Sequence, residues 1–254
     1  MNLWELSSLW RLLIFLLPFI LVQRWFHREL QYVLLLLTRR ENVVMILFSF
    51  LFFPGVALHE GSHFLAARLL GVRTGRISLV PQLQSDGKIR MGFVETERVD
   101  FVRNSLIGLA PLLSGGLLVA ILGVKVLALD SLGGFLSTGD WRALGEVLST
   151  QLSRPLFWLG LYLAVSISSM MLPSESDRRD WVPLIILLVA LVLIAYFAGA
   201  WQLVQPLAVS WLDRAFNAAG LVFGFSLTVL IACCVPLWIL RQVLFRIFHV
   251  RIKR

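Results

Sequence analysis

Two histidines and a glutamate form the most informative pattern in the chain. His59-Glu60-Gly61-Ser62-His63 matches H-E-x-x-H, which on a helix places two imidazoles four residues apart on one face, where both can reach a single zinc ion. The glutamate between them would lie beside the metal and could take a proton from a water molecule that the metal activates. The pattern therefore predicts a zinc site with His59 and His63 as ligands and Glu60 as the general base.

A third ligand is expected on another element, because a catalytic zinc usually has three protein ligands and keeps the fourth position for water. The apolar segment that contains the motif and the apolar segment that ends at Pro173 should reach the same side of the membrane. An acidic loop follows Pro173 directly. Asp177 is the preferred candidate in this loop, with Asp180 and Glu175 as the alternatives.

The composition indicates a membrane protein. Of 254 residues, 58% are hydrophobic and only 15% are charged, with a mean hydropathy of +0.83, whereas soluble domains are about half apolar and a quarter charged. No polar stretch is long enough for a second domain, so residues 1–254 are expected to form a single integral membrane domain. The net charge of +8 comes from Arg and Lys between apolar segments, which favours lipid headgroups over nucleic acid as the partner.

Six apolar segments are long enough, or nearly so, to cross a bilayer core of about 30 Å, which takes about 20 helical residues. They cover residues 9–26, 42–71, 101–127, 155–172, 181–200 and 218–240. The first contains Arg11 and Pro18 and could instead lie in the interface, which would leave five spans. The predicted fold class is an all-α polytopic membrane protein.

Two connecting segments have a recognisable pattern. Residues 77–94 alternate apolar and polar side chains around Ser85-Asp86-Gly87, which predicts a β-hairpin. Its exposed edge could hold a substrate as an added strand, or the hairpin could be a plain surface ribbon. Residues 201–216 combine Trp, Leu and Val with charged residues, which favours an interfacial helix.

The charged residues around the spans predict an orientation. Arg241 and Arg246 follow the last span, with three more basic residues at the end of the chain, so the C-terminus is expected on the cytoplasmic side. The protein itself is expected in the plasma membrane. The two remaining histidines, His27 and His249, lie in basic flanks and are expected to face headgroups.

The sequence resembles the site-2 protease family of intramembrane zinc metalloproteases. The likeness covers about residues 42–181, a catalytic core of three helices with the β-hairpin, and residues 182–254 would add accessory spans and a basic tail. It rests on residues 53–63, on Ala66, Ala67 and Gly71 after them, and on residues 107–116, IGLAPLLSGG, which are similar to that family's Ala-Gly-Pro-x-x-Asn span.

The chain also departs from that family. The usual second motif has an Asn three residues before its Pro and a metal-binding Asp five residues after it, followed by Gly; here Met170 and Arg178 occupy the Asn and Asp positions. Ser114 stands where the family often has Asn, and there is no room for a PDZ insert. The resemblance thus supports the zinc site more firmly than the third ligand.

These observations predict a zinc-dependent endopeptidase that cleaves membrane-spanning or membrane-adjacent segments of other proteins. One alternative is a catalytically inactive relative that binds membrane partners; the missing Asp-Gly motif favours it, and the intact Glu60 does not. A zinc transporter would need further His, Asp or Glu within several spans, and residues 101–127, 181–200 and 218–240 offer none within their apolar parts.

Overall fold

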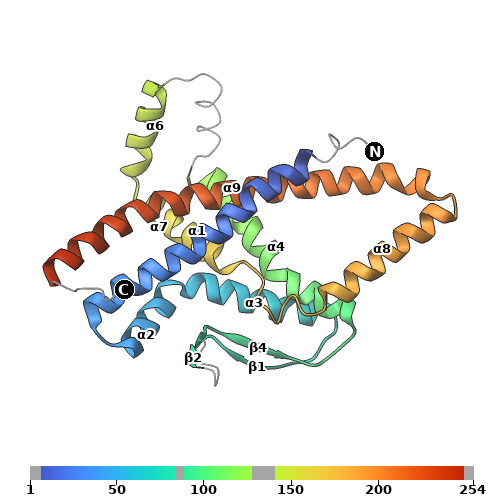
Figure 1. The fold of residues 1–254 in the computed structure, drawn as a ribbon, viewed down its shortest axis with the longest axis horizontal. Helices are drawn as coiled ribbons and strands as arrows, with labels where there is room; N and C mark the ends of the chain where they lie inside the picture. The colour runs from blue at the N-terminus through green and yellow to red at the C-terminus, as the bar shows by residue number, and fades with distance from the viewer. Residues whose placement is uncertain (1–6, 84–88, 128–140, 249–254) are drawn as a thin grey trace.

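The computed structural model describes residues 7–83, 89–127 and 141–248, and these form a helical protein with a small β-ribbon (Figure 1). The helices are α1 (Ser7–Thr38), α2 (Glu41–Leu51), α3 (Phe53–Leu69), α4 (Phe101–Lys125), α6 (Trp141–Leu152), α7 (Pro155–Met170), α8 (Trp181–Phe197) and α9 (Trp201–Phe248). The strands are β1 (Thr74–Ser78), β2 (Gln82–Leu83), β3 (Ile89–Arg90) and β4 (Phe93–Thr96). The turn expected at Ser85-Asp86-Gly87 lies outside the described residues.

The apolar helices are those of a membrane protein, but fewer of them qualify as spans than the sequence predicted. In the described part of the chain, α1, α4 and most of α9 are each long and apolar enough to cross a membrane. The bent pair of α2 and α3 makes a fourth span if it counts as one. The helices α7 and α8 are apolar but only 16 and 17 residues long. The described part of the chain thus shows three or four candidate spans, and the expected count of six is not confirmed.

Two predicted helix boundaries are wrong. The segment 42–71 is not one helix, because α2 and α3 meet at an angle of 67°. Pro54 lies in the first turn of α3, where it lacks the N–H that a continuous helix would need. Phe52, the residue between the two helices, is buried. At the other end of the chain, residues 201–216 are not a separate interfacial helix but the beginning of α9, which continues past Pro206 and Pro236.

The β-ribbon begins where α3 is terminated by a glycine. Gly71 has a positive φ of 71°, and the backbone N–H groups of Gly71 and Val72 donate to carbonyls of the last turn, which is the Schellman arrangement that ends a helix. The strand β1 then pairs antiparallel with β4, and β2 with β3. The predicted ribbon is thus confirmed in the described residues. It lies along α3 (Figure 1).

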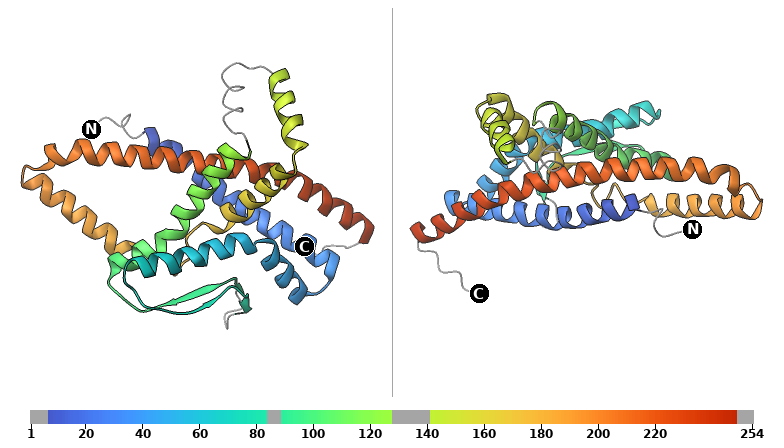
Figure 2. Two further views of the ribbon diagram at one scale, coloured as in Figure 1. Left: turned by 180° about the vertical axis from the view of Figure 1, so that it is seen from behind. Right: turned by 90° about the horizontal axis from the view of Figure 1, so that it is seen from above.

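The most extensive packing between two elements is that of α1 against α9, at the two ends of the described chain. These helices run together in each view (Figure 2), with Phe19 and Phe26 packed in one cluster with Phe223 and Leu230. An ion pair adds to this contact, since Arg241 Nη1 lies 2.5 Å from the buried Glu29 carboxylate. Removing one member of such a pair would leave the other charge buried alone, which is costly.

The helix that carries the H-E-x-x-H motif packs tightly against α7. The backbone N–H of Gly55 donates to Ser166 Oγ at 3.0 Å. A Cβ at position 55 would overlap the Ser166 carbonyl group, so only glycine allows the two backbones to approach this closely. Gly61, six residues further along α3, has nothing within 4 Å of the place a Cβ would take.

These two glycines make a matched pair for a stability test. Gly55→Ala should force α3 and α7 apart and lower the free energy of unfolding by about 1–3 kcal/mol, as overpacking does. Gly61→Ala should leave it unchanged or raise it by about 0.5–1 kcal/mol, because alanine is the better helix former. Reversible unfolding in mixed detergent micelles measures both, and equal values for the two variants would contradict the close approach.

Candidate metal centre

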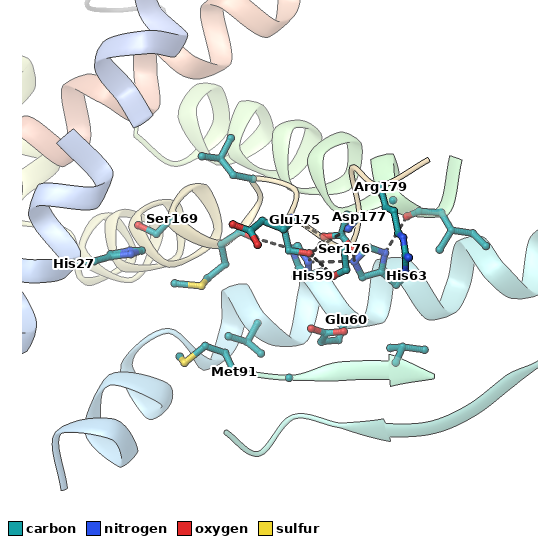
Figure 3. A pocket seen from close by; sticks show the side chains of 18 of the residues that line it. His27, His59, Glu60, His63, Met91, Ser169, Glu175, Ser176, Asp177 and Arg179 are labelled. Carbon is teal, nitrogen blue, oxygen red and sulfur yellow. Dashed lines mark hydrogen bonds and ion pairs between the residues drawn. The ribbon is translucent and has the colours of Figure 1, made fainter. Parts of the chain in front are cut away.

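Three side chains from two distant parts of the chain converge on one point. The Nε2 atoms of His59 and His63 lie 3.1 Å apart. The Asp177 carboxylate lies beside both, with Oδ1 3.3 Å from His63 Nε2 and Oδ2 3.6 Å from His59 Nε2. All the potential ligand atoms lie within 4.8 Å of one another. Figure 3 shows the three side chains gathered at one place in the cavity. The group can hold a metal ion, and among the described residues it is the one His/Cys/Asp/Glu cluster that can.

Backbone carbonyls on other elements orient both imidazole rings. His59 Nδ1 lies 2.7 Å from the Met170 carbonyl at the end of α7, and His63 Nδ1 lies 2.9 Å from the Ile107 carbonyl in α4. A carbonyl oxygen can only accept, so each Nδ1 must carry the proton. Each Nε2 then presents its lone pair to the shared point. Metal-binding histidines in proteins are held by such contacts, which fix the tautomer and the direction of the ring.

The charge at this point favours a cation. Two neutral Nε2 atoms that face each other repel unless a proton or a metal ion lies between them. Burial raises the pKa of the Asp177 carboxyl, but when an Nε2 atom carries a second proton the imidazolium donates to Asp177, and these interactions with His59 and His63 outweigh burial and hold that pKa well below its usual range. Asp177 is therefore ionised at neutral pH, and a carboxylate with two imidazoles is a common set of ligands for a divalent metal.

The loop between α7 and α8 holds Asp177 through short local contacts. The backbone N–H of Ser174 donates to Asp177 Oδ2 at 2.7 Å, and the Asp177 N–H donates to Ser174 Oγ at 3.3 Å. Ser105 in α4 donates to the Asp180 carbonyl at 2.9 Å, which ties the end of the loop to α4. A Cβ at position 108 would overlap the Asp177 carbonyl, so Gly108 lets the loop lie directly on α4.

Glu60 lies in the same cavity as the three potential ligands. The cavity has a volume of about 1580 Å³ and reaches from α1 and α2 to the 174–180 loop. On the way it passes His59, His63 and Asp177, the candidate metal-ligand group. Glu60 is buried, and Figure 3 shows its carboxylate between α3 and β4. A Cβ at position 92 would lie 2.9 Å from Glu60 Cγ. The absence of a side chain at Gly92 therefore leaves room for Glu60 next to the ribbon.

The structure brings together most of the residues that the sequence singled out. His59, His63 and Asp177 meet, and Glu60 lies in the cavity with them. Asp180 does not join the group, because it occupies the position before the first turn of α8, and Glu175 is exposed. Sequence reasoning missed the carbonyls of Met170 and Ile107, since any residue type can supply a backbone carbonyl.

The placement expected for His27 is wrong. His27 does not face headgroups from a basic flank. It lies within α1, with its ring edge-on to Phe48 and Phe52 at centroid distances of 5.4 and 5.0 Å, and it lines the cavity. A signal was present in the sequence, because Gln23 and His27 lie one turn apart and therefore on one face of an apolar helix. His249 lies outside the described residues.

Comparisons of the chain with protein-family models, with curated proteins and with solved structures found no match.

The third ligand can be tested by metal analysis. Asp177→Ala should remove the one carboxylate that lies beside both imidazoles, so the metal content of detergent-purified protein should fall from about one ion per chain to near zero after dialysis. Asp180→Ala is the matched control, because it removes a neighbouring carboxylate that does not join the group. Loss of metal from the Asp180 variant with retention in the Asp177 variant would contradict this geometry.

The close approach at Gly108 gives a second test that changes no ligand. Gly108→Ala should push the Asp177 carbonyl off α4 and weaken metal affinity about 10-fold or more, as changes behind a ligand commonly do. Gly116→Ala in the same helix should leave the affinity unchanged, because its Cβ would meet Val222 at 3.8 Å, an ordinary contact. Competition titration against a zinc-sensitive dye measures both constants.

Proposed function

We propose that the protein is a zinc-dependent endopeptidase that cleaves membrane-spanning or membrane-adjacent segments of other proteins. The observation that carries this proposal is the convergence of two imidazoles and a carboxylate in a cavity that also contains the Glu60 carboxylate. This is the donor set of a catalytic zinc site together with a candidate general base. The sequence resemblance to the site-2 protease family supports the same assignment.

The spacing of the ligands fits zinc. Two nitrogens bound to a tetrahedral zinc at ~2.0–2.1 Å stand about 3.3 Å apart, and the two Nε2 atoms are 3.1 Å apart. His59, His63 and Asp177 would hold the ion and leave a fourth position open toward the cavity. Bound there, zinc supplies a Lewis acid that polarises a peptide carbonyl and makes a water molecule more acidic.

Glu60 has the role of moving the proton. Its carboxylate takes a proton from the attacking water and passes it to the nitrogen of the leaving amine, so that a neutral amine departs. Its burial beside the ribbon reduces its contact with bulk water, which strengthens its interaction with a proton held in the cavity. The neighbouring imidazoles remain neutral in this scheme, because both Nε2 lone pairs are occupied by the ion.

The substrate must reach this point in an extended form, since the peptide groups of a helix are already hydrogen-bonded and shielded. The ribbon offers a surface that suits an extended chain. Among the described residues β4 pairs with β1 on one edge only, and Val94 and Thr96 line the cavity. We propose that the substrate lies beside β4 as an added strand, with the scissile bond near the imidazoles.

The remaining parts of the proposal concern the setting and the rival function. The basic residues after the last apolar segment favour a C-terminus on the cytoplasmic side. The membrane in this proposal is the plasma membrane. The alternative is a catalytically inactive protein that binds membrane partners, which the missing Asp-Gly motif favours. Glu60 argues against that alternative, because binding alone does not need a carboxylate buried next to a metal site.

Replacement of the general base separates the two functions. Glu60→Gln keeps the size of the side chain but cannot take a proton, so cleavage of a membrane-segment reporter should fall by about 10²–10⁴-fold while the zinc content stays unchanged. Incubation of purified protein with a pool of labelled single-span peptides, followed by mass spectrometry of the products, measures the cleavage. Zinc-loaded wild type that cleaves no peptide in the pool would favour the inactive binding protein.

A further inference from the structure

The cavity extends well beyond the metal-ligand group to a second end, which is lined by aromatic and hydroxyl side chains and not by the candidate ligands. This end lies between α1, α2 and the last turn of α7, where His27, Phe48 and Ser169 line it. Figure 3 shows the His27 ring extending from α1 toward Ser169, at the end of the cavity away from Glu60 and His63. The proposed reaction uses none of these three side chains.

Two polar atoms at this end are buried without a hydrogen-bond partner in the described residues. They are His27 Nε2 and Ser169 Oγ. Buried polar atoms in folded proteins are nearly always hydrogen-bonded, and leaving them unpaired is costly. Because both residues line the same cavity, a polar group bound at this end can supply the missing partner.

The surrounding contacts hold both residues in place without using these two atoms. Gln23, one turn before His27 on α1, donates to the backbone carbonyl of Ser169. The neighbouring Ser168 satisfies its own hydroxyl by donating to the Val165 carbonyl at 3.3 Å. The helices α1 and α7 are thus joined beside the site, while the Ser169 hydroxyl is left for another partner.

The site is also linked directly to the metal centre. Ser169 immediately precedes Met170, whose carbonyl accepts from His59 Nδ1. A chain that is held with its scissile bond at the imidazoles and continues along the cavity would therefore pass His27 and Ser169. A group bound there would fix which peptide bond reaches the metal centre.

We propose that His27 and Ser169 form a subsite that binds an uncharged hydrogen-bonding side chain of the substrate, an amide or a hydroxyl. A neutral imidazole nitrogen and a hydroxyl can together donate and accept, which matches Asn, Gln, Ser or Thr. A charged side chain would lose its hydration among the rings of Phe26, Phe48 and Phe52. The inference rests on the proposed function, since it assigns a specificity pocket to that reaction.

Binding to the inactive chain tests the subsite without cleavage. The full-length, zinc-loaded Glu60→Gln protein is titrated in detergent with fluorescent 20-residue apolar peptides that carry one Asn, moved residue by residue along the peptide, or Leu throughout. One Asn position should bind about 10-fold tighter than the all-Leu peptide. Added to this background, His27→Phe, which keeps an aromatic ring but removes its nitrogens, and Ser169→Ala should each remove most of that preference.

Ser226→Ala is the matched control. Ser226 Oγ is also buried without a partner, but Ser226 lies in α9 and does not line the cavity, so its variant should keep the preference. The subsite is overturned if no Asn position improves binding, or if the Ser226 variant loses the preference as the Ser169 variant does. Far-ultraviolet circular dichroism and zinc content check that each variant is folded.

The same peptides separate this inference from the proposed function. Incubation with the wild type, which retains Glu60, reports cleavage. An Asn preference that His27→Phe abolishes, without any cleavage by the wild type, would keep the subsite and reject the peptidase. Cleavage that depends on Glu60 but shows no preference for a polar side chain at any fixed distance from the cut bond would keep the peptidase and reject the subsite.

Discussion

The hydrogen bonds from His59 and His63 to backbone carbonyls are the contacts on which the rest of the centre depends. Each Nδ1–H is held by a different helix, His59 by α7 and His63 by α4. The ring directions are therefore set by how α3 packs against both neighbours. A carbonyl cannot be removed by a side-chain substitution, so the centre is best disturbed by moving a helix.

Glycine determines how closely these helices approach one another. At Gly55 the α3 backbone meets the α7 backbone, and at Gly108 the α4 backbone meets the loop that carries Asp177. Both contacts join backbone to backbone, where a methyl group has no flexible neighbour to displace. The metal-ligand group is thus built from two histidines one turn apart and a carboxylate more than a hundred residues later, brought together by positions that have no side chain.

The sequence was sufficient to predict much of the candidate site but less of the architecture. The spacing of His59 and His63 and the acidic residues after Pro173 predict metal ligands from residue types alone. In the structure Asp177 lies beside the two histidines. The bend at Phe52 and the single long helix α9 depend on packing and on the tolerance of a helix for proline, which hydrophobicity does not report. His27 was misplaced because its neighbours in sequence are basic, whereas its neighbours in space are Phe48 and Phe52.

The pairing of α1 with α9 bears on when the centre can form during synthesis. Glu29 and Arg241 are 212 residues apart in the chain, so α1 waits for its principal partner until α9 has been synthesised and has left the ribosome. The cavity wall that α1 supplies, with His27 and Gln31, gains its full support only then. A nascent chain that already contains the H-E-x-x-H helix and Asp177 therefore still lacks a fixed boundary on one side of its cavity, which delays the complete site until translation nears the end of α9.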